Sequence, residues 1–214
     1  MWARPEKRLT LARRDTALVI EGFPRSGNTF ASAAFMVANG RDVPLGRHLH
    51  GAPHLLRAAR LGVPAIALIR DPRDAVLSYV IRRPHLTVID SLIEYVDFYR
   101  TAWRARDSFV IGRFTQVTED FGSVIDEVNE RFGTTFTRYE PTAAASQSAI
   151  ELVEEMNREE SGGVIVESQV GRPSAERTEH RRQLEGLLEE PTVAPHLASA
   201  EEWFARYCAV HEAR

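Results

Sequence analysis

The stretch ALVIEGFPRSGNTF, residues 17–30, decides the fold of this chain. Its apolar beginning, Ala17–Ile20, is typical of a buried strand, and a glycine-bearing loop then leads into small residues with helical spacing. The backbone N–H groups of such a loop and the positive end of the following helix converge on one place, where they bind anions. The stretch therefore predicts a strand–loop–helix unit that holds a phosphate group.

The loop nearly matches the Walker phosphate-binding motif but lacks its lysine. Gly22 and Gly27 have the Walker spacing, and Asn28 stands at the lysine position. P-loop enzymes that use ATP or GTP need that lysine to reach the β- and γ-phosphates. The loop's one cation is Arg25, which precedes the second glycine. We therefore expect the loop to bind the 5′-phosphate of a donor other than ATP or GTP.

Length and composition allow an ordinary soluble enzyme. The chain has 214 residues, of which 43% are hydrophobic, and this is enough for a sizeable core. Its net charge of −3 at pH 7 argues against nucleic acid as a partner, because general nucleic-acid binding needs a basic surface. We expect a single domain over residues 1–214, with an α/β core over about 16–140 and a helical part over about 141–214.

The chain also carries signals that bear on its location. Cys208 is the only cysteine, so an intrachain disulfide is impossible. The first fifteen residues are charged and have no apolar centre, unlike a secretory signal. No stretch approaches the length of a membrane span. We therefore expect a soluble cytoplasmic protein.

Strand-like and helix-like segments alternate along the first two-thirds of the chain. Strands are predicted at Ala17–Ile20, Leu45–His50, Ala65–Ile69 and Ser108–Phe114. Helices are predicted at Ser26–Asn39, Pro53–Leu61, Asp71 to about Arg82, Ile89–Arg106 and Asp120–Phe132, and further helices at Ala149–Glu160, Ala175–Glu189 and Ala198–Glu212. This order predicts an α/β fold in three layers, with helices on both faces of a central parallel sheet.

A second constellation lies in residues 68–80, LIRDPRDAVLSYV. Arg70 ends a predicted strand, Asp71 is a good helix N-cap, and Ser78 follows in the second turn of the helix. Parallel strands end at one edge of their sheet, so Arg70 and Ser78 are expected beside the phosphate loop. They would hold a second anion there. A nucleotide with phosphates on both its 5′ and 3′ positions suits two such sites.

Together the two segments resemble the cofactor signatures of sulfotransferases that use 3′-phosphoadenosine 5′-phosphosulfate (PAPS). The first family signature, Pro-Lys-Ser-Gly-Thr-Thr-Trp, falls on Pro24, Arg25, Ser26, Gly27, Asn28, Thr29 and Phe30. The second, Arg-Asn-Pro-x-Asp followed by a serine, falls on Arg70, Asp71, Pro72, Arg73, Asp74 and Ser78. The resemblance implies a P-loop-like fold in which the first segment binds the 5′-phosphosulfate and Arg70 and Ser78 bind the 3′-phosphate.

The chain departs from the family pattern at several positions. Arg25 replaces a lysine, which keeps the charge and changes its geometry. Asn28 and Phe30 replace a threonine and a tryptophan, which keeps one polar and one aromatic side chain. The family's C-terminal Arg-Lys-Gly segment, which closes over the 3′-phosphate, is not present as such. Arg172, in Gly-Arg-Pro, is the candidate to replace its charge.

The resemblance also implies the reaction, which is transfer of a sulfuryl group to a hydroxyl or amine of a small molecule or glycan. Arg25 would stabilise the leaving phosphate, and a histidine would act as general base. The candidates are His48 and His50, which point the same way in an extended strand. Both stay open. We expect no metal, because no carboxylate or cysteine joins the two histidines as a ligand.

Two other functions fit parts of the same sequence. A P-loop kinase or nucleotide hydrolase would bind Mg²⁺ and a triphosphate, with Asp71 as an acidic ligand, and the missing Walker lysine argues against it. A non-catalytic nucleotide-binding module of the same fold would bind the bisphosphate without turnover.

Overall fold

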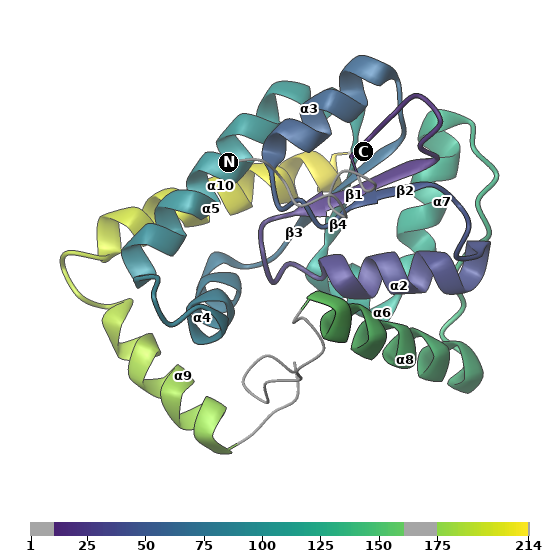
Figure 1. Cartoon of the computed structure of the whole chain (residues 1–214). Helices are drawn as coiled ribbons and strands as arrows, with labels where there is room; N and C mark the ends of the chain where they lie inside the picture. The colour runs from purple at the N-terminus through teal and green to yellow at the C-terminus, as the bar shows by residue number, and fades with distance from the viewer. Residues whose placement is uncertain (1–10, 161–174, 214) are drawn as a thin grey trace.

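The computed structural model describes residues 11–160 and 175–213, and four parallel strands form its central sheet (Figure 1). The strands are β1 (Leu18–Gly22), β2 (Leu45–Arg47), β3 (Ala65–Ile69) and β4 (Val110–Arg113). Their order across the sheet is β2-β1-β3-β4. The prediction of a central parallel sheet between helices is confirmed.

Helices cover both faces of this sheet and make a three-layer α/β fold. Alternate residues of β3 show the division, since Ala67 and Ile69 join one hydrophobic core and Ile66 and Leu68 the other. The first face carries α3 (Ala52–Leu61), α4 (Pro72–Arg82), α5 (Val88–Ala102) and α10 (Ala194–Glu212), and α9 (Ala175–Leu187) packs on α4. The second carries α2 (Asn28–Asn39), α6 (Phe114–Glu119) and α7 (Phe121–Phe132), and α8 (Ala143–Glu160) packs on α2.

Local sequence signals determine where α4 and α2 begin. α4 begins as predicted after Asp71, whose carboxylate accepts hydrogen bonds from the backbone N–H groups of Arg73 and Asp74. α2 begins at Asn28 and not at Ser26, because Gly27 adopts a left-handed conformation with φ of 94°.

The prediction of a strand over Leu45–His50 is wrong beyond Arg47. His48 and His50 have φ of 60° and 49°, in the left-handed region, and a strand cannot continue through such residues. The helix predicted over Ile89–Arg106 also ends early, and a 3₁₀ segment, η1 (Trp103–Ser108), follows α5. The histidines therefore lie in a loop between β2 and α3.

The strand order places the carboxyl ends of β1 and β3 side by side. The chain passes from β1 outward to β2 and then crosses back to β3, so the direction in which the sheet grows reverses between β1 and β3. Ligands of open α/β sheets bind at such a point. The strands approach closely here, because a Cβ atom on Gly22 would lie 2.7 Å from the carbonyl oxygen of Leu68. The phosphate loop and Arg70 are thereby brought together.

None of the helices in the described part of the chain has the length and apolar character needed to cross a membrane.

Candidate active site

A cavity of about 1700 Å³ opens at the carboxyl edge of the sheet. Segments that follow all four strands contribute to its lining, together with side chains from α4, α5 and α8. Most of the predicted site residues line it, namely Pro24, Arg25, Gly27, Asn28, Thr29, Phe30, His48, His50, Arg70 and Ser78. Arg172 lies outside the described residues. The structure thus brings the two sequence motifs and the histidine pair to one cavity.

The loop between β1 and α2 is tightly folded. Arg25 and Gly27 both have left-handed backbone conformations, with φ of 70° and 94°. The N–H of Ser26 donates to the carbonyl of Phe23 at 3.2 Å, which closes a turn. Left-handed residues that alternate with other conformations turn successive backbone N–H groups toward one side and form a concave surface that binds anions. The N-terminus of α2 adds the positive end of a helix to it.

Asn28, at the Walker lysine position, is a structural part of the loop. Its side chain is 3% exposed, and Nδ2 donates to the carbonyl oxygen of Phe23 at 3.0 Å. The carbonyl of Asn28 in turn accepts from the hydroxyl of Ser32 at 2.8 Å. Asn28 therefore fixes the loop, whereas a Walker lysine projects a charge toward the nucleotide.

Ser26 supports the loop from the interior of the protein. The residue is buried, and its Oγ lies 3.4 Å from the hydroxyl of Tyr99, which donates to the carbonyl oxygen of Leu68 at 2.8 Å. Burial raises the pKa of Tyr99, so its hydroxyl stays protonated and remains a donor. Tyr99 therefore ties the phosphate loop to β3. From the sequence, Tyr99 is only an aromatic residue on a predicted amphipathic helix, and its contact with the loop is not predicted.

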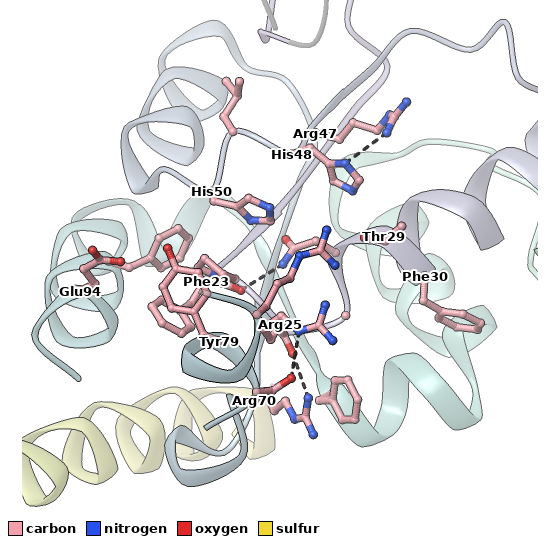
Figure 2. Close-up of a pocket in the computed structure, with 18 of the residues that line it drawn as sticks. Phe23, Arg25, Thr29, Phe30, Arg47, His48, His50, Arg70, Tyr79 and Glu94 are labelled. Atoms are coloured by element: carbon pink, nitrogen blue, oxygen red, sulfur yellow. Dashed lines mark hydrogen bonds between the residues drawn. The ribbon is translucent and has the colours of Figure 1, made fainter. Parts of the chain in front are cut away.

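Arg25 connects the two sequence motifs directly. Its Nε donates to the hydroxyl of Ser78 on α4 at 2.9 Å, and its carbonyl oxygen accepts from Nη1 of Arg70 at 3.1 Å. Figure 2 shows Arg25 at the centre of the group, with the histidines on one side and Arg70 on the other. The residues that the resemblance divides between two phosphate subsites thus form one hydrogen-bonded unit.

Arg70 is held on several sides. Its guanidinium lies over the ring of Phe114, 4.0 Å from the ring centre, and its Nη2 is 3.7 Å from a carboxylate oxygen of Asp74. Its backbone carbonyl accepts from the hydroxyl of Tyr95 at 2.8 Å. Burial lowers the pKa of Arg70, and Asp74 opposes the shift, so the side chain stays charged at neutral pH. The buried Nε has no hydrogen-bond partner among the described residues.

His48 and His50 face the cavity as a stacked pair although they do not lie in a strand. Their ring centres are 5.8 Å apart and the rings are nearly parallel, at 16°. Nδ1 of His50 lies 3.4 Å from the carbonyl oxygen of Gly22, at the end of β1, and Nδ1 of His48 lies 3.4 Å from a guanidinium nitrogen of Arg47. Nε2 of His48 is buried, and His50 is exposed.

Beyond the histidines, aromatic and charged side chains line the other part of the cavity. Phe23 packs edge-to-face against Tyr79, with ring centres 5.3 Å apart. Burial, with the nearby carboxylate of Glu94, raises the pKa of Tyr79. Phe98 and Asp97 of α5 also line the cavity, as do Arg82, the last residue of α4, and Arg83, which follows it. These side chains line the same cavity as the phosphate loop.

Comparisons with known proteins give structural similarities but no match at the level of sequence. No protein-family model matches the chain, and no curated protein matches it. Among solved structures, the chain is similar to mouse sulfotransferase SULT7A1, whose crystal structure is a complex with PAP. The similarity covers 92% of this chain and 94% of the mouse chain, with a TM-score of 0.43 and 13% sequence identity.

Proposed function

We propose that this protein is a sulfotransferase that moves a sulfuryl group from PAPS to a hydroxyl or amine of a small molecule or glycan. The observation that carries this proposal is the unit formed by Arg25, Ser78 and Arg70 at the end of β1 and β3. Two arginines from different strand ends meet there beside a concave phosphate loop. Such an arrangement suits a nucleotide with phosphates on both its 5′ and its 3′ positions.

The residues at the loop fit the 5′ side of PAPS. The left-handed conformations of Arg25 and Gly27 and the start of α2 supply backbone donors and a positive helix end. Arg25 supplies the charge that a backbone surface lacks. Ser78 already accepts a hydrogen bond from Arg25, so the guanidinium is oriented before any ligand binds.

Arg70 fits the 3′ side of PAPS. Phe114 fixes the plane of its guanidinium, and the buried Nε is a donor without a partner in the part of the chain that the structure describes. A phosphate oxygen would provide that partner. Because arginine presents several donors in one plane, Arg70 can bind a phosphate while Nη1 still holds the carbonyl of Arg25.

When bound, PAPS would supply an activated sulfuryl group. In the transfer, the bond from sulfur to the bridging oxygen of the 5′-phosphate would break, and a bond from sulfur to the acceptor oxygen or nitrogen would form. The electron pair of the broken bond stays on the phosphate, where Arg25 and the loop N–H groups neutralise the growing charge. The proton of the acceptor passes to a histidine. His50 suits this role better than His48, because it is exposed and Gly22 can hold a proton on its Nδ1, leaving Nε2 as the base.

The geometry favours this function over a P-loop kinase or hydrolase. Asn28, at the Walker lysine position, is held inside the loop by the carbonyl of Phe23. Asp71, the acidic ligand that a kinase would need, caps α4 through hydrogen bonds from two backbone N–H groups. A non-catalytic module would keep the nucleotide site and would not depend on the histidines.

Turnover tests the proposal. PAPS incubated with the protein and a panel of phenols, sugar alcohols and primary amines is expected to yield PAP and a sulfated product in equal amounts, as measured by mass spectrometry. The reaction should proceed in the presence of EDTA. PAP that binds without any product from the panel would favour the non-catalytic module instead.

A further inference from the structure

A buried carboxyl group lies behind the histidines and has no part in the reaction described so far. Glu21, on β1, is 0% exposed. An acidic side chain removed from water is costly unless other groups hydrogen-bond to it. Glu21 lies one residue before Gly22, the end of the strand that leads into the phosphate loop.

One oxygen of Glu21 receives two donors. Oε1 accepts the backbone N–H of Leu49 at 2.8 Å and lies 3.2 Å from Nδ1 of His54. Oε2 has no hydrogen-bond partner within residues 11–160 and 175–213. Oε1 of Glu21 therefore joins His54, on α3, to Leu49, the residue between the two site histidines.

The backbone fixes the proton on His54. The N–H of Ala12 donates to Nε2 of His54 at 2.8 Å, so that nitrogen carries no proton in the neutral ring. The proton must then be on Nδ1, which donates to Glu21. Gly46 makes room for the ring, since a Cβ atom there would lie 3.1 Å from both Cε1 and Nε2 of His54.

The histidine loop needs such support. His48 and His50 both have left-handed backbone conformations, with φ of 60° and 49°. Such a conformation is unfavourable for a residue other than glycine and persists only where its surroundings impose it. Two consecutive residues of β1 do so, because Glu21 holds the N–H of Leu49 and the carbonyl of Gly22 lies 3.4 Å from Nδ1 of His50.

We propose that Glu21, held by His54, is a positioning residue that fixes the loop at Leu49 and thereby directs the histidine base into the cavity. The inference rests on the proposed sulfotransferase function, in which a histidine of this loop takes the acceptor proton. Glu21 acts through an oxygen that accepts a hydrogen bond, and its charge is not what orients the loop.

Two substitutions at Glu21 separate a role of its acceptor oxygen from a role of its charge. Glu21→Gln keeps an acceptor oxygen, and Glu21→Leu removes it at similar volume. We expect Glu21→Leu to lower kcat by about 10- to 100-fold, the range found when a hydrogen bond that orients a metal ligand is lost. KM for PAPS and Kd for PAP should stay within about 3-fold of wild type, because the phosphate loop is held by other contacts. Glu21→Gln should keep kcat within a few-fold. Glu202→Leu, on the exposed face of α10, is the matched control.

Hydrogen exchange at the Leu49 amide gives a readout that needs no turnover. This amide should be protected in the wild type and in Glu21→Gln and should exchange faster in Glu21→Leu. Equal losses of kcat in both variants would show that charge matters and would overturn the proposal. So would unchanged exchange and kcat in Glu21→Leu, or a parallel loss of PAP binding.

The design also separates this inference from the proposed function. If the wild type binds PAP but turns over no PAPS, the sulfotransferase function fails, and Leu49 exchange still decides whether Glu21 fixes the loop. If Glu21→Leu does not fold, Gly46→Ala takes its place, since the added methyl displaces the His54 ring. It should lower kcat without a comparable change in KM, and an unchanged kcat would contradict the proposal.

Discussion

His50→Ala is expected to lower kcat by about 10² to 10⁴, because the acceptor loses the base that takes its proton. Kd for PAP should change less than about 3-fold, since the imidazole does not contribute to either proposed phosphate subsite. His48→Ala should lower kcat less than about 10-fold, because Nε2 of His48 is buried and its Nδ1 lies against Arg47. Steady-state release of PAP and calorimetric titration with PAP measure the two quantities.

His85→Ala is the control for this pair, because His85 is exposed and does not line the cavity. It should leave both kcat and Kd unchanged. If His48→Ala causes the large loss and His50→Ala the small one, the assignment of the base is wrong. If neither substitution lowers kcat, the histidines take no part in the chemistry and the proposed mechanism is contradicted.

Arg70→Ala is expected to weaken the binding of PAP by about 100-fold, which corresponds to about 2.7 kcal/mol. The substitution removes a charged donor for the 3′-phosphate and its stacking on Phe114, and it leaves the carbonyl of Arg25 without this hydrogen bond. Adenosine 5′-monophosphate has no 3′-phosphate, so its affinity should fall less than about 5-fold. Calorimetric titration of both nucleotides gives the comparison.

Arg206→Ala is the matched control, because Arg206 also belongs to a salt bridge but lies on α10 outside the cavity lining. The Arg206→Ala variant should bind PAP with the affinity of the wild type. A similar loss of affinity for both nucleotides in Arg70→Ala would mean that Arg70 only supports the phosphate loop. The assignment of Arg70 to the 3′-phosphate would then be wrong.

The parts of the fold that the sequence predicts well are those with strong local signals. The apolar run Ala65–Ile69 is a buried strand with the same bounds in the structure, and Asp71 and Pro72 start a helix by capping and by a fixed φ. The phosphate loop is likewise a local pattern of glycines after an apolar run. Because parallel strands share an edge, these local features also predict that the two motifs meet.

Other parts of the site depend on packing between distant segments. The hydrogen bond from Arg25 to Ser78 joins residues that are 53 positions apart, and no sequence pattern indicates it. The turn of the histidine segment out of β2 depends on Glu21, whose acidic side chain gives no sign of burial by itself. Tyr99 is similar, since an aromatic residue on a helix predicts packing but not a hydrogen bond to a strand carbonyl.

Calorimetric titration of the wild-type protein with PAP, and separately with ATP and Mg²⁺, tests the central claim most directly. The two arginine subsites predict that PAP binds at least about 100-fold more tightly than adenosine 5′-monophosphate and more tightly than ATP with Mg²⁺. Binding of ATP with Mg²⁺ that is stronger than binding of PAP, with no gain from the 3′-phosphate, would contradict a PAPS site and favour a P-loop kinase or hydrolase.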